Sequence, residues 1–304
     1  MTKIAVFDAK PYDRASFDAA NAGRYAFRYF ETRLTAASVP LAGGCAGVCA
    51  FVNDAVDAAT VEGLVARGVK VLALRCAGYN NVDFKAAFEK GLTVVRVPAY
   101  SPYAVAEHAM ALLMTLNRHL HKAAARTRDF NFSLVGLTGM DLHGKTAGVV
   151  GTGKIGRIFC DICKGLGMRV LAYDAFPNPA SGLDYVTLDR LLAESDVVSL
   201  HCPLTPETHH LFNAETIGMM KPGAFLVNTS RGGLVEIGAL LDALRSGRLG
   251  GAGLDVYEEE SDWFYEDRSQ RVNQDKVLAL LVSMPNVLVT SHQAFLTLSL
   301  IHIS

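Results

Sequence analysis

The chain has 304 residues, of which 50% are hydrophobic and 19% are charged, so it can bury substantial cores, and its length corresponds to about two domains. Its 29 Lys and Arg against 30 Asp and Glu leave a net charge of −1. This balance argues against a protein that binds nucleic acid or an anionic membrane through a basic surface. No apolar stretch approaches the roughly 20 residues that span a bilayer. We therefore expect neither a nucleic-acid nor a membrane partner.

The first residues and the cysteines predict a cytoplasmic location. Asp8 interrupts the apolar run that a signal peptide would need. The six cysteines have no regular spacing, which is typical of buried thiols in a reducing compartment.

Short β-branched apolar runs recur along the chain in two series. Runs of four to six residues without polar alternation are typical of parallel strands buried on both faces, and helical stretches between them indicate βαβ units. The pattern predicts an α/β fold of two Rossmann-like or flavodoxin-like parallel-sheet domains, with helices on both faces and a cleft between them. The expected strands are residues 4–7, 48–52, 69–74 and 93–97, then 147–150, 169–173, 197–200, 224–228, 251–256 and 287–290.

The two series meet near Pro98, and a long helix is expected after it. Ser101 and Pro102 are suited to the N-cap and the first helical position. Apolar residues then recur at helical spacing as far as Leu120, which predicts one helix bridging the domains. Residues 131–144 are expected to form a loop.

A glycine-rich turn follows the first strand of the second series. Gly151-Thr152-Gly153-Lys154-Ile155-Gly156 stands between a predicted strand and a helix, where G-x-G-x-x-G turns bind the pyrophosphate of a dinucleotide. The next strand ends at Asp174, about 20 residues further on, where a carboxylate accepts from ribose hydroxyls and repels a 2′-phosphate. The turn therefore predicts NAD rather than NADP; the alternative is a structural βαβ turn with an incidental aspartate.

Three polar segments follow predicted strands of the same series: residues 228–233, 255–260 and 291–295. They supply Arg231, Glu260 and His292. A guanidinium can hold a carboxylate bidentately, and a histidine oriented by a carboxylate can act as general acid and base. Each residue has an ordinary structural explanation, but the three beside a dinucleotide turn predict a redox site.

Other chemistry-bearing residues favour no metal site. Cys160 and Cys163 fall on the helix after the turn, where buried thiols pack against a sheet. Together with Cys45 and Cys49 they could supply the four ligands of a zinc site, which is the alternative. His209-His210 is expected to be solvated. The acidic run 258–260 could bind a cation, but its position favours a catalytic role.

At this point the residues resemble a known family. The chain is similar to the D-isomer-specific 2-hydroxyacid dehydrogenases, and within them to the bacterial fermentative D-lactate dehydrogenases. The insert 259–275 looks like that of the lactate-forming branch. The matching segments are 51–54, 74–78, 97–102, 106–109, 148–156, 199–205, 227–232, 255–258 and 292–295.

The resemblance implies NAD-dependent reduction of pyruvate to D-lactate, with Arg231, Glu260 and His292 as catalytic residues. It implies a substrate domain of residues 1–98 plus 292–304, an NAD domain of residues 99–291, and a homodimer or homotetramer. The implied cofactor contacts are Gly151, Gly153, Lys154, Ile155, Gly156, Asp174, Cys202, Pro203, Thr229, Ser230, Arg231 and Asp255. The implied substrate contacts are Arg75, Ala77 and Gly78 (through backbone N–H groups), Tyr100, Arg231, His292 and Phe295.

The end of the chain departs from the family pattern, which continues past residues 292–295 with a helix that packs on the first domain. Residues 296–304 lack the charged helical continuation, so we expect that helix to be missing. Two alternatives stay open. One is a 2-hydroxyacid dehydrogenase for another 2-keto acid, such as phenylpyruvate or hydroxypyruvate, and the other is a non-catalytic NADH-sensing interaction protein.

Overall fold

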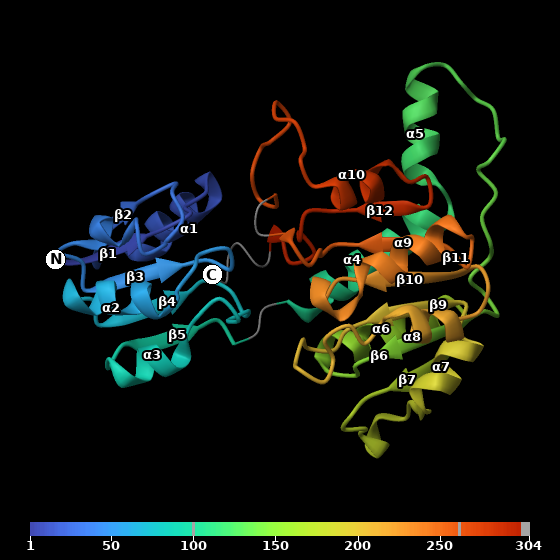
Figure 1. Cartoon of the computed structure of the whole chain (residues 1–304), viewed down its shortest axis with the longest axis horizontal. Coiled ribbons are helices and arrows are strands. Elements are labelled where there is room, and N and C mark those ends of the chain that lie inside the picture. The colour runs from blue at the N-terminus through green and yellow to red at the C-terminus, as the bar shows by residue number, and fades with distance from the viewer. Residues whose placement is uncertain (99–100, 261–262, 299–304) are drawn as a thin grey trace. The chain divides into compact units, whose positions relative to one another are not determined.

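The computed structural model describes residues 1–98, 101–260 and 263–298, which form two compact units (Figure 1). Unit 1 contains Met1–Ser101 and the segment that begins at Leu296, and unit 2 contains Pro102–Phe295. These divisions follow Ser101 and Phe295, whereas the sequence placed them after residues 98 and 291. The last residues, on which the expected absence of a C-terminal helix rests, lie outside the described part from position 299 onward.

Unit 1 is built on a five-stranded parallel sheet in the order β2-β1-β3-β4-β5. Its core gathers fully buried apolar residues such as Phe7, Leu64 and Leu72. The strands are β1 (Thr2–Val6), β2 (Tyr25–Tyr29), β3 (Gly47–Ala50), β4 (Val71–Leu74) and β5 (Thr93–Arg96), and the helices are α1 (Pro11–Asn21), η1 (Val39–Ala42), α2 (Ala58–Ala66) and α3 (Phe84–Glu89).

Unit 2 is built on a seven-stranded parallel sheet in the order β12-β11-β10-β9-β6-β7-β8. One face packs against α4 and α6, and the other packs against α7, α8, α9 and α10, so two apolar cores enclose the sheet. The strands are β6 (Thr146–Val150), β7 (Arg169–Tyr173), β8 (Asp184–Tyr185), β9 (Val197–Leu200), β10 (Ala224–Asn228), β11 (Leu249–Leu254) and β12 (Val287–Val289). The helices are α4 (Pro102–Asn117), α5 (Leu120–Arg128), α6 (Lys154–Gly165), η2 (Pro179–Ser181), α7 (Leu188–Glu194), α8 (Ala214–Met219), η3 (Gly232–Leu234), α9 (Ile237–Arg245) and α10 (Lys276–Ser283).

The predicted α/β fold with two parallel-sheet domains is confirmed, and each of the ten expected runs overlaps a strand. The sequence missed β2 and β8, which lie at the edges of their sheets. An edge strand pairs on one side and is partly exposed, so it needs no continuous β-branched run. In β2 the aromatic residues Tyr25, Phe27 and Tyr29 instead alternate with Ala26 and Arg28.

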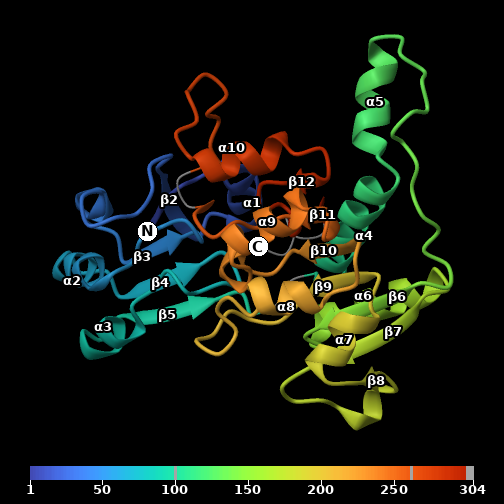
Figure 2. The same cartoon turned by 45° about the vertical axis from the view of Figure 1, so that its right-hand side comes forward.

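The single long helix expected after Pro102 is wrong. The chain forms α4 and α5 with a break at His119, whose φ of 50° is left-handed. The amide of Asn117, at the end of α4, pairs with the backbone of Met140 in both directions (2.8 and 2.9 Å). The returning loop thus fixes where α4 ends. In the two cartoon views α5 stands away from the sheet of unit 2 (Figures 1 and 2), and α4 packs on that sheet.

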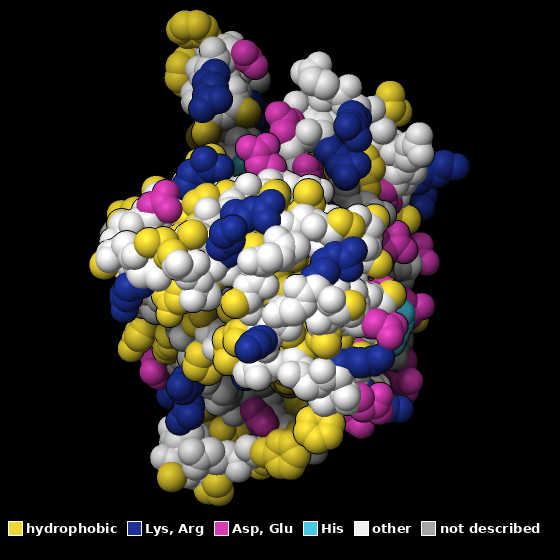
Figure 3. Space-filling model, turned by 90° about the vertical axis from the view of Figure 1, so that its left-hand side faces the viewer, with side chains coloured by type: hydrophobic (Ala, Val, Ile, Leu, Met, Phe, Trp, Pro, Cys, Tyr) yellow, Lys and Arg dark blue, Asp and Glu magenta, His cyan; other side chains and the backbone are white. Residues whose placement is uncertain are grey.

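On the face in Figure 3, Lys and Arg side chains are interspersed with Asp and Glu side chains and separated by uncharged ones. Within the residues that the structure describes, no helix is both long and apolar enough to cross a membrane.

Candidate active site

The site is built at one edge of the unit 2 sheet. Because all seven strands run parallel, the carboxyl ends of neighbouring strands meet at the same edge, where ligands bind in open α/β sheets. The loops after β6, β9, β10, β11 and β12 begin there. They contain residues 151–156, 201–205, 229–231, 255–260 and 290–295.

The first of these loops is the glycine turn, and its three glycines have different surroundings. Gly151 has a φ of +91°, and a β-carbon there would meet the backbone of Cys202 at 2.5 Å. A β-carbon on Gly156 would collide with the carbonyl oxygen of Gly151, so its hydrogen side chain lets α6 start against the turn. A β-carbon on Gly153 would meet nothing within 4 Å. The first and third glycines are thus required by the chain itself, whereas the second borders free space at the N-terminus of α6, where Lys154 and Ile155 begin the helix.

A cavity of about 500 Å³ lies beside this turn, within the size range of ligand sites. Asp174 is on its wall, where one carboxylate oxygen accepts from the N–H (2.6 Å) and the hydroxyl (2.8 Å) of Thr152. Burial alone would raise the pKa of Asp174, but the hydrogen bonds from Thr152 and from the Phe176 N–H outweigh it, so the pKa lies below its ordinary value. The wall therefore carries a fixed negative charge. The lining also includes Gly151, Gly153, Tyr173, His201, Cys202, Pro203, Thr205, Thr208 and Leu211.

The loop after β10 adds a polar atom without a partner. Thr229 is buried, and among the described residues its Oγ1 makes no hydrogen bond. The neighbouring Ser230 donates to the carbonyl of Cys202 at 2.6 Å, which joins this loop to the one after β9. Burial raises the pKa of the Cys202 thiol to about 11, so it lines the cavity as a neutral group. The open side of Gly153 and the unpaired Thr229 hydroxyl both fit a dinucleotide bound at this edge.

Arg231 is held by contacts that the sequence did not reveal. The side chain of the buried Asn228 accepts from the Ser230 N–H (3.0 Å) and donates to the Arg231 carbonyl (2.9 Å). A β-carbon on Gly232 would collide with the backbone of Tyr257, so this glycine lets the loop after β10 lie directly against the loop after β11. These contacts bring Arg231 beside the loop that carries the acidic residues.

His292 and Glu260 form a direct pair. His292 Nδ1 lies 2.6 Å from Glu260 Oε1, and both side chains are largely buried, with exposed fractions of 14% and 18%. A carboxylate only accepts, so this bond places a proton on Nδ1 and leaves Nε2 for exchange with a ligand. The other oxygen of Glu260 accepts from the Tyr257 N–H at 3.0 Å. Of the three consecutive glutamates, Glu260 is therefore the one that orients His292.

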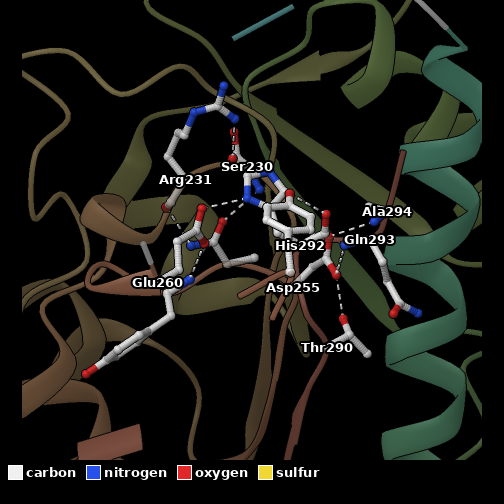
Figure 4. Close-up of polar contacts among 11 residues, drawn as sticks. Ser230, Arg231, Asp255, Glu260, Thr290, His292, Gln293 and Ala294 are labelled. Atoms are coloured by element: carbon white, nitrogen blue, oxygen red, sulfur yellow. Dashed lines mark hydrogen bonds and ion pairs between the residues drawn. The ribbon is translucent and has the colours of Figure 1, made fainter. Parts of the chain in front are cut away.

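Asp255 organises the backbone that carries His292 (Figure 4). Its fully buried carboxylate accepts from the Thr290 hydroxyl (2.5 Å) and from the N–H groups of Gln293 (2.9 Å) and Ala294 (2.8 Å). Its own carbonyl accepts from the His292 N–H at 2.7 Å. The φ of His292 is 52°, a left-handed backbone conformation that residues other than glycine rarely adopt. The hydrogen bonds to Asp255 hold this conformation in place.

The protonation of Asp255 is settled by the same network. Burial alone would raise its pKa, but His108, 3.3 Å away, and the hydrogen bonds from Thr290 and two backbone N–H groups outweigh it. The pKa of Asp255 therefore lies below its ordinary value, and the group is a carboxylate. Resemblance predicted a contact with NAD for Asp255, and that contact stays a prediction beside the positioning role seen here.

An aromatic cluster that the sequence did not predict covers one side of His292. Tyr265 donates to the His292 carbonyl at 2.9 Å. The rings of Tyr265, His292 and Phe295 lie 6.1–6.5 Å apart. Phe295, predicted to contact substrate, thus lies next to the histidine, and the insert that contains Tyr265 supports the same turn.

The remaining predicted substrate contacts belong to unit 1. The guanidinium of Arg75 donates to the carbonyls of Phe7 (3.0 Å) and Asp8 (2.6 Å), and the Arg75 N–H extends the sheet by donating to Ala50. The backbone-binding prediction therefore rests on Ala77 and Gly78, which follow in the same loop. Tyr100 lies outside the described residues.

The cysteines of the C-x-x-C motif pack in a core, as expected. Cys160 and Cys163 are fully buried in α6, and burial raises the pKa of both thiols, that of Cys160 to about 12. Neutral thiols at helical spacing are typical of packing and not of metal binding.

Comparisons with known proteins agree with this geometry. The family described as D-isomer specific 2-hydroxyacid dehydrogenase, NAD binding domain, matches residues 110–294. The chain is 53% identical to a 2-hydroxyacid dehydrogenase homolog of Haemophilus influenzae (97% of this chain, 90% of that protein) and 52% identical to the D-lactate dehydrogenase of Escherichia coli (97% and 91%). It is also similar to the solved structure of the pyruvate reductase of Chlamydomonas reinhardtii, with a TM-score of 0.93, 44% identity, and coverage of 100% and 93%. The chain therefore belongs to the D-isomer-specific 2-hydroxyacid dehydrogenases, NAD-dependent oxidoreductases that act on the CH–OH group of 2-hydroxy acids.

Proposed function

We propose that the protein is an NAD-dependent D-lactate dehydrogenase that reduces pyruvate to D-lactate. The observation that carries this proposal is the 2.6 Å bond between His292 and Glu260, formed at the same sheet edge as the glycine turn. The relatives of Escherichia coli and Chlamydomonas reinhardtii, named as a D-lactate dehydrogenase and a pyruvate reductase, support the choice of substrate.

The residues at this edge have separate roles in the proposed reaction. When bound, the nicotinamide supplies the hydride for the keto carbon. His292 gives the proton on Nε2 to the developing alkoxide, while Glu260 keeps the imidazole oriented. Arg231 holds the substrate carboxylate with its planar guanidinium and stabilises negative charge on the reacting oxygen. In lactate oxidation His292 receives the proton instead.

The cofactor roles follow from the cavity wall. Gly153 borders free space at the N-terminus of α6, and the unpaired N–H groups of a helix start suit the pyrophosphate. The carboxylate of Asp174 suits the ribose hydroxyls, and the hydroxyl of Thr229 suits a polar group of the nicotinamide half. For the substrate we propose the backbone of Ala77 and Gly78, together with Tyr100 and the apolar ring of Phe295.

The test follows NADH absorbance with pyruvate, phenylpyruvate, hydroxypyruvate and glyoxylate, and then determines the configuration of the product by chiral chromatography. We expect the highest kcat/KM with pyruvate and a D-product. His292→Asn should lower kcat about 10²-fold or more, the scale of general acid catalysis. His143→Asn, at an exposed histidine of unit 2, is the matched control.

The alternatives predict other results. A faster reaction with phenylpyruvate or hydroxypyruvate would assign the enzyme to another 2-keto acid. NADH binding without turnover of any of the four acids by the folded protein would indicate a sensing protein and contradict the proposal.

We also propose that the enzyme is a homo-oligomer. The loop after α5 exposes four apolar side chains by 70–85% of their surface, and apolar groupings of this kind mark protein interfaces. Size-exclusion chromatography with light scattering should give a dimer or a tetramer. Leu134→Asp should shift the molar mass in solution toward that of the monomer. Val272→Asp, at an equally exposed position, should leave the molar mass unchanged. The four side chains are Phe130, Phe132, Leu134 and Val135.

A cytoplasmic location is proposed from the cysteines. All six are free thiols, and five of them are buried. Free thiols are typical of reducing compartments. Fractionation of the source cells tests this, and recovery of the protein with secreted material would contradict it.

A further inference from the structure

We propose that His209, His210 and Glu258 form a binding site for a divalent transition-metal ion of the zinc class. The two histidines follow β9, and the glutamate follows β11. The Nε2 of His210 lies 3.1 Å from both oxygens of Glu258, and the Nε2 of His209 lies 3.4 Å from one of them. One potential ligand atom from each residue lies within 4.8 Å of the other two. We call these three residues the His-His-Glu cluster.

The backbone is shaped to bring both rings to the same carboxylate. Successive side chains of an extended chain point to opposite sides, so neighbouring histidines do not ordinarily stack. Here His210 has a left-handed φ of 50°, and its ring stacks on that of His209 with 3.9 Å between centroids. The left-handed conformation is unfavourable for a residue with a β-carbon and must be held by its surroundings.

Contacts on both sides of the cluster hold this conformation. The His210 N–H donates to the carbonyl of Gly233 at 2.8 Å, and the His209 N–H donates to Thr205 at 2.9 Å. The Asn213 amide donates to the His210 carbonyl at 3.3 Å. The segment of residues 205–211, which we call the histidine loop, is therefore anchored to the loop after β10. That loop itself lies against the backbone next to Glu258. The backbone of the two histidines is therefore held in place before any ion binds.

The distances suit a tetrahedral ion. Zinc binds imidazole nitrogen at about 2.0–2.1 Å and carboxylate oxygen at about 2.0–2.2 Å, so two ligand atoms on a tetrahedron lie roughly 3.3–3.5 Å apart. The observed nitrogen–oxygen distances of 3.1 and 3.4 Å need only a small adjustment. Two imidazoles with one carboxylate favour Zn²⁺ and its neighbours over Mg²⁺ or Ca²⁺, which prefer oxygen ligands. The side chains are 35–51% exposed, so an ion and a water as fourth ligand can reach them.

The position gives the ion a structural consequence. Thr205, Thr208 and Leu211 of the histidine loop line the cofactor cavity, and Glu258 stands two residues before Glu260. A bound ion would cross-link the loop after β9 to the loop after β11. It would hold one wall of the cavity against the segment that carries Glu260.

The experiment uses the full chain without an affinity tag, freed of metal with a chelator. It is titrated with Co²⁺, whose visible absorption is strong only in tetrahedral sites, and Zn²⁺ then displaces the cobalt. We expect a tetrahedral spectrum at one equivalent per chain. His209→Asn and Glu258→Gln each remove one ligand of the ion. Removing a residue that only supports a ligand already weakens metal binding by about 10- to 100-fold, so removing a ligand should weaken it by about 100-fold or more. His210→Asn should do the same, because asparagine also adopts the left-handed conformation.

Two matched controls separate this site from others. Glu259→Gln changes the next carboxylate, and His143→Asn removes an exposed histidine elsewhere in unit 2, so both should bind like the unaltered chain. Binding that survives in the cluster variants would place the ion elsewhere, for example at His292 and Glu260, and would overturn the proposal. Absence of a tetrahedral spectrum in the unaltered chain would show that the cluster is only a hydrogen-bonded ion pair, and would overturn it as well.

Discussion

Asp255→Asn tests whether the turn that carries His292 depends on one buried carboxylate. One oxygen accepts from Thr290 and Gln293, and the other accepts from Ala294. An asparagine keeps one acceptor and places an NH₂ group against a donor. If its oxygen takes the first position, the Ala294 N–H is left buried and unpaired, which costs about 1–3 kcal/mol.

The two remaining hydrogen bonds also weaken. Hydrogen bonds to charged groups contribute about 1.5–3 kcal/mol and those to neutral groups about 0.5–1.5, so each bond loses roughly 1 kcal/mol. The active geometry of the turn should therefore be destabilised by about 3–5 kcal/mol. At 1.36 kcal/mol per tenfold change in rate, we expect kcat to fall by about 10²-fold or more.

The assay compares kcat and KM for NADH with pyruvate as substrate, and checks the fold of each variant by thermal unfolding. If Asp255 positions His292, kcat falls far more than KM for NADH rises. Thr290→Val removes a single donor and leaves the carboxylate charged, so it loses about 1.5–3 kcal/mol and should lower kcat by about 10- to 100-fold, less than Asp255→Asn does. A folded Asp255→Asn protein with kcat within threefold of the unaltered chain would refute the reasoning.

Three further substitutions test other parts of unit 2. Arg231→Lys should lower kcat/KM by about 10²-fold or more, because a point charge does not reproduce the planar guanidinium. Gly156→Ala places a β-carbon against the Gly151 carbonyl and should raise KM for NADH at least about tenfold, while destabilising the fold by about 1–3 kcal/mol. Burial lowers the pKa of His201 to about 3, whereas an unfolded histidine titrates near 6.5. Between these values the unfolded state binds more protons, so the free energy of unfolding should fall by about 2 kcal/mol from pH 7 to pH 5 on account of His201. Urea unfolding followed by the fluorescence of Trp263, the single tryptophan, measures this, and His201→Gln should remove that part of the pH dependence.

Each of the three has a contrary result, and two of them have a matched control. Near-normal turnover of Arg231→Lys would remove the carboxylate-binding role. Gly165→Ala, in the same helix, adds a β-carbon with nothing within 4 Å and should leave KM unchanged; an equal effect of both alanines would contradict the packing argument. His143→Gln, at an exposed histidine, should keep the pH dependence of the unaltered chain. If the free energy of unfolding falls equally between pH 7 and pH 5 in His201→Gln, groups other than His201 cause the fall.

The elements that could be predicted from the sequence are those whose signal is local. Central parallel strands are covered on both faces, so each appears as a short apolar run. The edge strands β2 and β8 were missed because β2 alternates aromatic residues with Ala26 and Arg28 and β8 has only two residues, so neither forms such a run. The end of α4 depends on the hydrogen bonds between Asn117 and Met140, which are 23 positions apart. The residues around Asn117 do not predict a contact with so distant a part of the chain.

The same distinction applies to the site. Arg231, Glu260 and His292 could be proposed because parallel strands bring their carboxyl ends to one edge, so position after a strand is sufficient. Their supports come from segments with no common spacing. His108, which contacts Asp255, lies on α4. Tyr265, which donates to the His292 carbonyl, lies in the long insert.

The histidines set aside as solvated show the opposite limit. A pattern of two adjacent histidines is uninformative by itself, because an ordinary backbone points them apart. The left-handed φ of His210 and the carboxylate of Glu258, 48 positions further along, are what bring the three side chains together.

The left-handed backbone of His292 decides which inactive enzyme is useful for capturing a substrate. Asparagine enters that region of φ and ψ with little strain, whereas a β-branched residue would force the whole turn to rearrange. Crystals of His292→Asn soaked with NADH and pyruvate are therefore suited to trapping both reactants unreacted, with the Tyr265 bond to the backbone carbonyl at position 292 still able to form.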